Sequence, residues 1–305
     1  MFYLKSKKKG FTLVELLTVL AIITMLVGLL VPSLNVVRRI AKEAKQRSEL
    51  TTIDTALTAF RNDYGDYPPS DGWDYDTGTP GGEPLPYCGA QKLCEALLGW
   101  DLMGFHPDSA WRWDGLDIAG GPLTYDPQRV RGDVTLYERK GRYLELATVN
   151  AFRLGISGPG QQDGLFDIPA TYPLFPAAHT FVLCDVFGFK KITIAGKVYN
   201  AGSPVLYYRA NTSSRTIEDG ADLSGLIYEA TDNQTVVALR DVDEDGDIGD
   251  HPLGQPADDY QYFYDYITDA RVPGVWPYRP HSYILITAGA DGLYGTGDDI
   301  CNFGN

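Results

Sequence analysis

Two acidic clusters are the residues whose types and spacing point most directly to chemistry. The first lies near the C-terminus, where residues 289–300 read GADGLYGTGDDI and contain Asp291, Asp298 and Asp299. Calcium takes about six to eight oxygen ligands from carboxylates and backbone carbonyls, and glycines allow the tight turns that direct carbonyls inward. The segment therefore predicts a calcium-binding loop, with an acidic turn that holds no metal as the alternative.

The second cluster is DVDEDGD at residues 241–247. Its D-x-D-x-D-G spacing matches the first half of an EF-hand calcium loop. Pro252 stands where such a loop carries its closing glutamate, so a later acid such as Asp250, Asp258 or Asp259 has to complete the ligand shell. A solvated acidic loop is the alternative. The candidate ligands of this second site are Asp241, Asp243, Asp245 and Asp247.

A charged residue inside an apolar run marks the N-terminus. Residues 1–10 are basic (MFYLKSKKKG), and residues 11–34 are apolar apart from Glu15. About 20 apolar residues in a helix cross the bilayer core, and the preceding lysines hold their end in the cytoplasm. A plain signal-anchor helix explains both features. It leaves Glu15 unexplained, because a carboxylate within the membrane costs about 2.5–3.5 kcal/mol.

Cleavage of the bond between Gly10 and Phe11 would give Glu15 a partner, because it creates a new α-amino group four residues away. Within one helix that amine points along the axis, so the amine of a neighbouring subunit is the better partner. Burial of this charge pair between subunits would set their stagger, as a buried polar group sets the register of a coiled coil.

The sequence GFTLVE at residues 10–15, between a basic leader and an apolar run, resembles the processing site of type IV prepilins and type II secretion pseudopilins. The resemblance implies that a prepilin peptidase cuts after Gly10 and N-methylates Phe11, and that Glu15 serves methylation and assembly. It further implies a single-pass bacterial inner-membrane protein with a periplasmic body. Such a subunit polymerises with itself and with other pseudopilins, through an inner-membrane assembly platform, into a periplasmic or surface filament.

The C-terminal acidic segment in turn resembles the calcium loop of type II secretion major pseudopilins, which also follows the last strand. The resemblance implies side-chain ligands at Asp291, Asp298 and Asp299, and we place carbonyl ligands at Leu293 and Thr296. The body is larger than that of a typical major pseudopilin. A surface type IV pilin or minor pilin acting in adhesion or uptake is therefore the alternative to a pseudopilus subunit.

The helical pattern continues beyond the apolar run, because apolar residues recur at steps of three and four from Leu50 to Tyr64. One helix is predicted from Phe11 to about Tyr64, with residues 11–34 forming the membrane or filament-core half and residues 35–64 the amphipathic half. Proline removes a helix hydrogen bond, so Pro32 predicts either a mild kink or unwinding on assembly.

The rest of the chain, residues 65–305, is predicted to form one β-rich body. A short helix is expected at residues 90–103, and strands are expected where β-branched and aromatic residues gather, at residues 180–187, 192–199, 204–209, 226–230 and 283–287. The predicted fold class is α+β and type IV pilin-like, with a long N-terminal helix packed on an antiparallel sheet that carries large loop insertions.

Charge and motifs narrow the function classes. Residues 1–50 carry a net charge of +6. Because the whole chain has a net charge of −14, the remaining residues carry −20. Such an acidic body argues against nucleic acid as a partner, because phosphate binding needs a basic surface. The sequence has no nucleophile elbow, P-loop, HExxH or dinucleotide motif, so we do not expect an enzyme.

The four cysteines fit no zinc-binding spacing. An exported protein can hold disulfides. One bond between Cys88 and Cys94, and a second between Cys184 and Cys301, are therefore possible. Unpaired buried thiols are the alternative.

Overall fold

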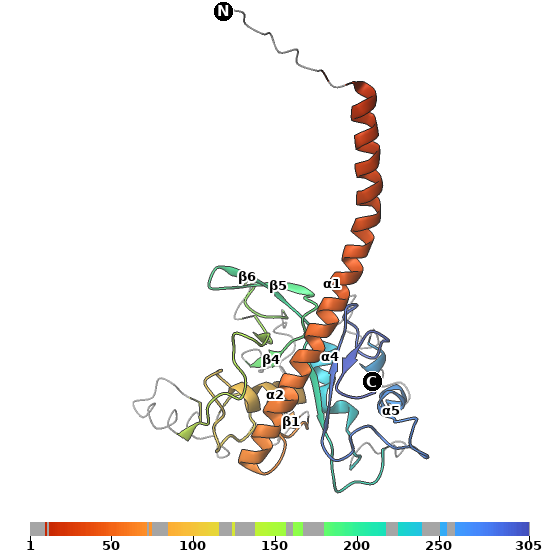
Figure 1. Cartoon of the computed structure of the whole chain (residues 1–305). Coiled ribbons are helices and arrows are strands. Elements are labelled where there is room, and N and C mark those ends of the chain that lie inside the picture. The colour runs from red at the N-terminus through yellow and green to blue at the C-terminus, as the bar shows by residue number, and fades with distance from the viewer. Residues whose placement is uncertain are drawn as a thin grey trace, which may run out of the picture. The chain divides into compact units, whose positions relative to one another are not determined.

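The computed structural model of the chain forms two compact units, Met1–Ala44 and Lys45–Asn305. It describes residues 10, 12–71, 73–74, 85–115, 124–125, 138–156, 161–166, 180–217, 225–239, 251–254 and 260–304. Helix α1 (Leu13–Tyr64) begins in the first unit and ends in the second. In the second unit, the C-terminal part of this helix is combined with several small antiparallel sheets (Figure 1). This arrangement confirms the predicted α+β, pilin-like class.

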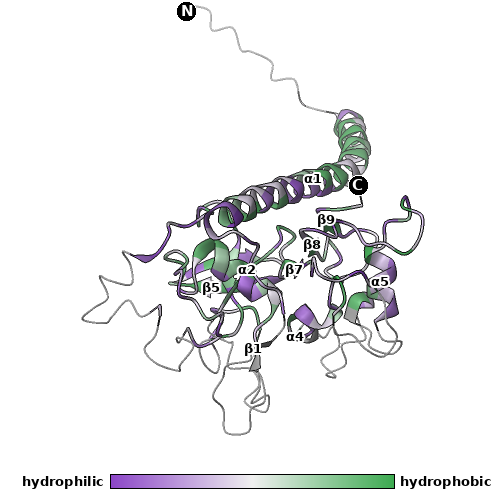
Figure 2. Ribbon diagram, turned by 90° about the horizontal axis from the view of Figure 1, so that it is seen from below, coloured by the Kyte–Doolittle hydropathy of each residue, from purple (hydrophilic) through white to green (hydrophobic). Residues whose placement is uncertain are grey.

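In the first unit, α1 is a helix with apolar side chains on every side. The large apolar side chains between Leu13 and Ile40 are exposed, and Figure 2 shows the hydrophobic colour along this part of the helix. A helix that is hydrophobic all round needs an apolar environment. The helix is unbroken across Pro32, so unwinding on assembly stays a prediction. Its start at Leu13 lies two residues after the predicted one.

The second unit is built on the sheet β7-β8-β9, formed by β7 (Leu206–Arg209), β8 (Tyr283–Thr287) and β9 (Ile300–Cys301). Both neighbouring pairs are antiparallel. Successive side chains of a strand point to opposite faces. Accordingly Tyr207 and Leu285 belong to one hydrophobic core, whereas Leu206, Ile284 and Ile286 belong to another. The sheet is therefore buried on both faces.

The C-terminal half of α1 covers one of these faces together with α2 (Gly89–Leu98). The predicted apolar stripe is buried, with members Leu50, Ile53, Leu57 and Phe60. Polar contacts fix the helix along its length. Gln46 Oε1 accepts the Val186 N–H at 2.9 Å, and Asp54 accepts the Tyr283 hydroxyl proton at 2.7 Å.

Smaller elements surround this centre. The two-stranded sheets pair β1 (Trp73–Asp74) with β2 (Leu85–Pro86), β3 (Ala151–Arg153) with β4 (Phe181–Leu183), and β5 (Lys190–Ile194) with β6 (Lys197–Ala201). On the sheet face opposite α1, the described helical segments are η2 (Ala230–Asn233), α4 (Gln234–Ala238), η4 (Pro252–Gly254) and α5 (Gln261–Ile267).

Three predicted elements are corrected. The strand predicted at residues 192–199 is a hairpin, because Ala195 and Gly196 both have positive φ and form a two-residue turn. The segment predicted as a strand at residues 226–230 forms bends that lead into η2, although the Ile227 N–H still donates to the Thr216 carbonyl. The helix predicted at residues 90–103 ends at Leu98.

The two proposed disulfides are absent, because all four cysteines are free thiols. Cys88 caps α2 and Cys94 lies within it, and six residues of helix separate two Cα atoms by about 9 Å, beyond disulfide reach. Cys184 pairs with Pro204 in an isolated β-bridge just before β7, whereas Cys301 lies on β9, and β8 lies between β7 and β9. Neighbouring strands lie about 4.8 Å apart, so at least two such spacings separate Cys184 from Cys301, which is beyond the reach of a disulfide.

Candidate functional site

The processing segment begins α1 with a capping box. Thr12 donates its N–H to Glu15 Oε2 at 2.8 Å, and the Glu15 N–H donates to Thr12 Oγ1 at 3.2 Å. The Thr12 hydroxyl also donates to Glu15 Oε2 at 2.8 Å. These bonds satisfy N–H groups that a helix start leaves without partners. In the single chain, the carboxylate of the apolar run is therefore held by its own helix terminus. Phe11 lies outside the described residues.

The C-terminal acidic loop joins β8 to β9. Asp298 Oδ2 accepts the N–H groups of Ala290 and Asp291, at 2.6 and 3.0 Å, and its Oδ1 accepts the Thr296 hydroxyl proton at 2.6 Å. The Leu293 N–H donates to Asp291 Oδ1 at 2.8 Å. The predicted ligand residues therefore share one loop that its own carboxylates organise.

Asp299 is the loop's most buried acid. Its Oδ2 accepts the Gly295 N–H at 2.7 Å and the Tyr266 hydroxyl proton at 2.8 Å, while its buried Oδ1 has no hydrogen-bond partner. Burial raises the pKa of Asp299 to about 7. A cation would satisfy the orphan oxygen. In the part of the chain that the structure describes, however, Asp291, Asp298 and Asp299 do not bring one oxygen each within 4.8 Å of one another. Calcium would have to draw the carboxylates away from the N–H donors.

The second predicted calcium site falls on residues that the structure does not describe. Asp241, Asp243, Asp245 and Asp247 all belong to this stretch, as do the acids proposed to close the shell. The D-x-D-x-D-G cluster therefore stays a prediction.

A different group of possible metal ligands is present in the described body. One ligand atom each from His106, Asp108 and Glu138 lies within 4.8 Å of the other two. His106 is buried and the two acids are exposed. Burial lowers the pKa of His106, against the pull of Asp108 and Glu138. The cluster has the donor set of a metal site, and its chemistry does not identify the ion by itself.

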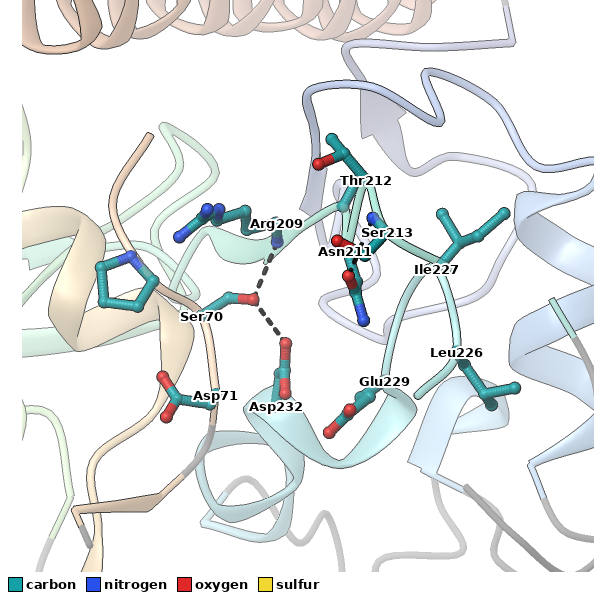
Figure 3. A pocket seen from close by; sticks show the side chains of 12 residues that line it. Ser70, Asp71, Arg209, Asn211, Thr212, Ser213, Leu226, Ile227, Glu229 and Asp232 are labelled. Carbon is teal, nitrogen blue, oxygen red and sulfur yellow. Dashed lines mark hydrogen bonds between the residues drawn. The ribbon is translucent and has the colours of Figure 1, made fainter. Parts of the chain in front are cut away.

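The body also has a polar pocket of about 360 Å³ (Figure 3). Ser70 is one of its lining residues, and it donates its hydroxyl proton to Asp232 Oδ2 at 2.5 Å and accepts the Arg209 N–H at 2.8 Å. Burial raises the pKa of Asp232, which is 4 % exposed, to about 8. Glu229 and Asp71 add to this shift, whereas the Ser70 hydrogen bond opposes it.

The pocket and the histidine cluster are not visible as motifs in the sequence. His106 and Glu138 are 32 positions apart in the sequence, and Ser70 and Asp232 are 162 positions apart. The local signals were a His-Pro-Asp tripeptide and isolated polar residues, which are common in loops.

Comparison with known proteins returns one family. Residues 5–31 match the prokaryotic N-terminal methylation motif. No curated protein and no solved structure matches the chain significantly. The same stretch begins the one described helix that is long and apolar enough to cross a membrane. The chain thus carries the N-terminus of a prepilin-type protein, a class of mostly structural subunits that are anchored in the inner membrane, processed, and polymerised through the N-terminal helix.

Proposed function

We propose that the protein is a structural subunit of a type II secretion pseudopilus. Prepilin peptidase cuts after Gly10 and methylates Phe11, and the mature helix then enters a filament with other copies and other pseudopilins through the inner-membrane assembly platform. The capping box supports a part of this scheme. Glu15 is held by Thr12 in the single chain, so it can exchange these bonds for the α-amine of a neighbouring subunit without first being exposed unpaired.

The observation that carries the pseudopilus assignment is the acidic loop between β8 and β9. The resemblance to major pseudopilins implies a calcium loop in this segment, although the short strand β9 follows it here. Its Asp299 has a buried carboxylate oxygen without a hydrogen-bond partner, which supports the proposal. Calcium is the proposed ion, with Asp291, Asp298 and Asp299 as side-chain ligands and the carbonyls of Leu293 and Thr296 as backbone ligands. Bound there, calcium would supply a charge that neutralises the loop.

A surface type IV pilin or minor pilin, acting in adhesion or uptake, is the second candidate. The size of the body supports it, since residues Lys45–Asn305 form one compact unit. A body of this size can present a ligand-binding surface outside the cell.

Deletion of the gene, followed by complementation, tests the assignment. We expect the deletion to abolish release of secreted enzymes without removing surface fibres. Loss of long surface fibres with normal secretion would contradict the pseudopilus and favour the pilin. Mass spectrometry of the mature protein should show a chain that begins at methylated Phe11, whereas an intact Met1 would contradict processing.

A matched pair of variants isolates the role of Glu15 in the same strain. Glu15→Ala should be inserted and cut normally but should reduce filament assembly severely, because it removes the partner of the neighbouring amine. Glu43→Ala is the control, since Glu43 is a partly exposed carboxylate of the same helix, and its described ion pair is with Arg39 at 3.4 Å. Equal assembly of both variants would refute the pairing.

A further inference from the structure

Two segments of the body that are distant in sequence are held together by a close backbone contact. The Lys140 N–H donates to the Phe105 carbonyl at 3.0 Å. Gly104 has φ +109, and a Cβ there would lie 2.2 Å from the Lys140 carbonyl oxygen. Only glycine allows this approach. Residues on either side of the contact, His106 and Glu138, are thereby brought to the same place.

A chain of hydrogen bonds holds the backbone at His106. His106 is 3 % exposed, and its main-chain N–H donates to the Tyr125 hydroxyl at 3.2 Å. That hydroxyl donates in turn to Glu95 of α2 at 2.9 Å. His106 Nε2 is buried without a hydrogen-bond partner, and it lies 3.4 Å from Glu138 Oε2. The ring is therefore held with an unsatisfied nitrogen facing a carboxylate.

The charges around this nitrogen are unbalanced. Arg139 is the neighbouring cation, but its guanidinium makes two hydrogen bonds to Asp101, at 2.7 and 2.8 Å. Within the described residues, no lysine or arginine forms an ion pair with Asp108 or Glu138. Two carboxylates thus converge on a histidine, and a divalent cation would balance both.

We propose that His106, Asp108 and Glu138 bind a divalent transition metal of the zinc class. Calcium and magnesium prefer oxygen-only shells, whereas zinc takes imidazole nitrogen together with carboxylate oxygen. Zinc bonds of about 2.0–2.1 Å at tetrahedral angles place neighbouring ligand atoms about 3.4 Å apart. This is the separation between His106 Nε2 and Glu138 Oε2. Three protein ligands leave the fourth position to water.

Metal binding at Nε2 requires one rearrangement. The Asp108 N–H now donates to His106 Nδ1 at 3.1 Å, which places the ring proton on Nε2. The metal takes the place of the proton on Nε2, and the ring carries its proton on Nδ1 instead. The Asp108 N–H then no longer donates to Nδ1, and the bond from Nε2 to the metal replaces this hydrogen bond. Asp108 contributes its carboxylate from the same turn.

The test is zinc binding to the full-length protein in detergent, in the presence of excess calcium to fill oxygen-only sites. After equilibrium dialysis, elemental analysis should find one zinc per wild-type chain. The variants Glu138→Gln and Asp108→Asn should each bind at least about tenfold more weakly. Both residues are exposed, so these variants should keep the fold. Glu145→Gln, at another exposed acid of the same region, should bind like the wild type.

The melting temperature gives a second readout. Zinc should raise it in the wild type and in Glu145→Gln, and at the same zinc concentration should raise it clearly less in Glu138→Gln and Asp108→Asn, because weaker binding stabilises the folded form less. Absence of bound zinc in the wild type, or equal binding by all four proteins, would overturn the proposal. Neither result depends on whether the protein serves secretion or a surface pilus.

Discussion

One buried carboxylate, that of Asp232, makes the folding stability of the body depend on pH. Its pKa in the folded protein, about 8, lies above the ordinary value of 3.8. The folded state therefore binds a proton more tightly than the unfolded chain does. Its contribution to stability is complete below about pH 4 and is lost as the pH rises toward 8, at a rate of up to about 1.4 kcal/mol per pH unit.

Replacement of Asp232 by Asn should flatten this dependence. The amide oxygen still accepts the Ser70 hydroxyl proton, and no ionisation follows at high pH. We expect the melting temperature of the wild type to fall more steeply between pH 5 and 9 than that of Asp232→Asn. Asp299 also has a raised pKa and acts in both proteins, so the difference between the two curves is the measurement. Glu145→Gln should follow the wild type, and parallel curves for the wild type and Asp232→Asn would contradict the account.

Single residues also mark the limit of sequence reading. Glu15 was identified because a charge in an apolar run is costly wherever the chain folds. The roles of His106 and Asp232 depend on neighbours that only the tertiary structure supplies, across 32 and 162 positions. The residue types around them in the sequence are common in loops and do not identify a site.

At the scale of elements, α1 was predictable because its periodic apolar stripe extends over several turns. The hairpin of β5 and β6 was missed because the chain reverses within an apolar, β-branched run, and only Gly196 marks the turn. The segment at residues 226–230 has the side chains of a strand, but the hydrogen bonds of Ile227 with Thr216 and Asn211 do not continue into a strand ladder. Side-chain type does not reveal whether a pairing partner exists.

The stripe of α1 provides a stability test. Leu57 is 0 % exposed in the core between α1, α2 and the central sheet. Leu57→Ala should lower the free energy of unfolding by about 2–5 kcal/mol, because it removes apolar contacts and leaves a cavity. Denaturant unfolding of the full-length protein measures this change. Thr58→Ala, on the exposed face of the same turn, should cost less than 1 kcal/mol as an order of magnitude, and a similar loss in both variants would show that the stripe is not the packed face.

At the scale of the whole molecule, calcium binding should appear as stability. A ligand that binds only the folded form at about 100 times its dissociation constant adds about 2.7 kcal/mol. We therefore expect millimolar calcium to raise the melting temperature of the full-length protein, and a chelator to reverse the rise.

Variants locate the ion. Asp298→Asn and Asp291→Asn should lose the difference between calcium and chelator, and Asp265→Asn, at an exposed acid of α5, should keep it. A calcium effect that survives in the loop variants would place the ion elsewhere, for instance at Asp241–Asp247. If calcium and the chelator leave the melting temperature of the wild type unchanged, the protein does not bind calcium as proposed.

The free cysteines have a practical consequence for studying the filament. Burial raises the pKa of all four thiols above the ordinary value, for Cys301 to about 12, so they stay protonated and unreactive near neutral pH. A cysteine introduced on the surface would be the one thiol open to rapid alkylation. Neighbouring subunits could then be cross-linked or labelled at chosen positions in the native background, and the body would need no oxidising enzyme to reach its fold.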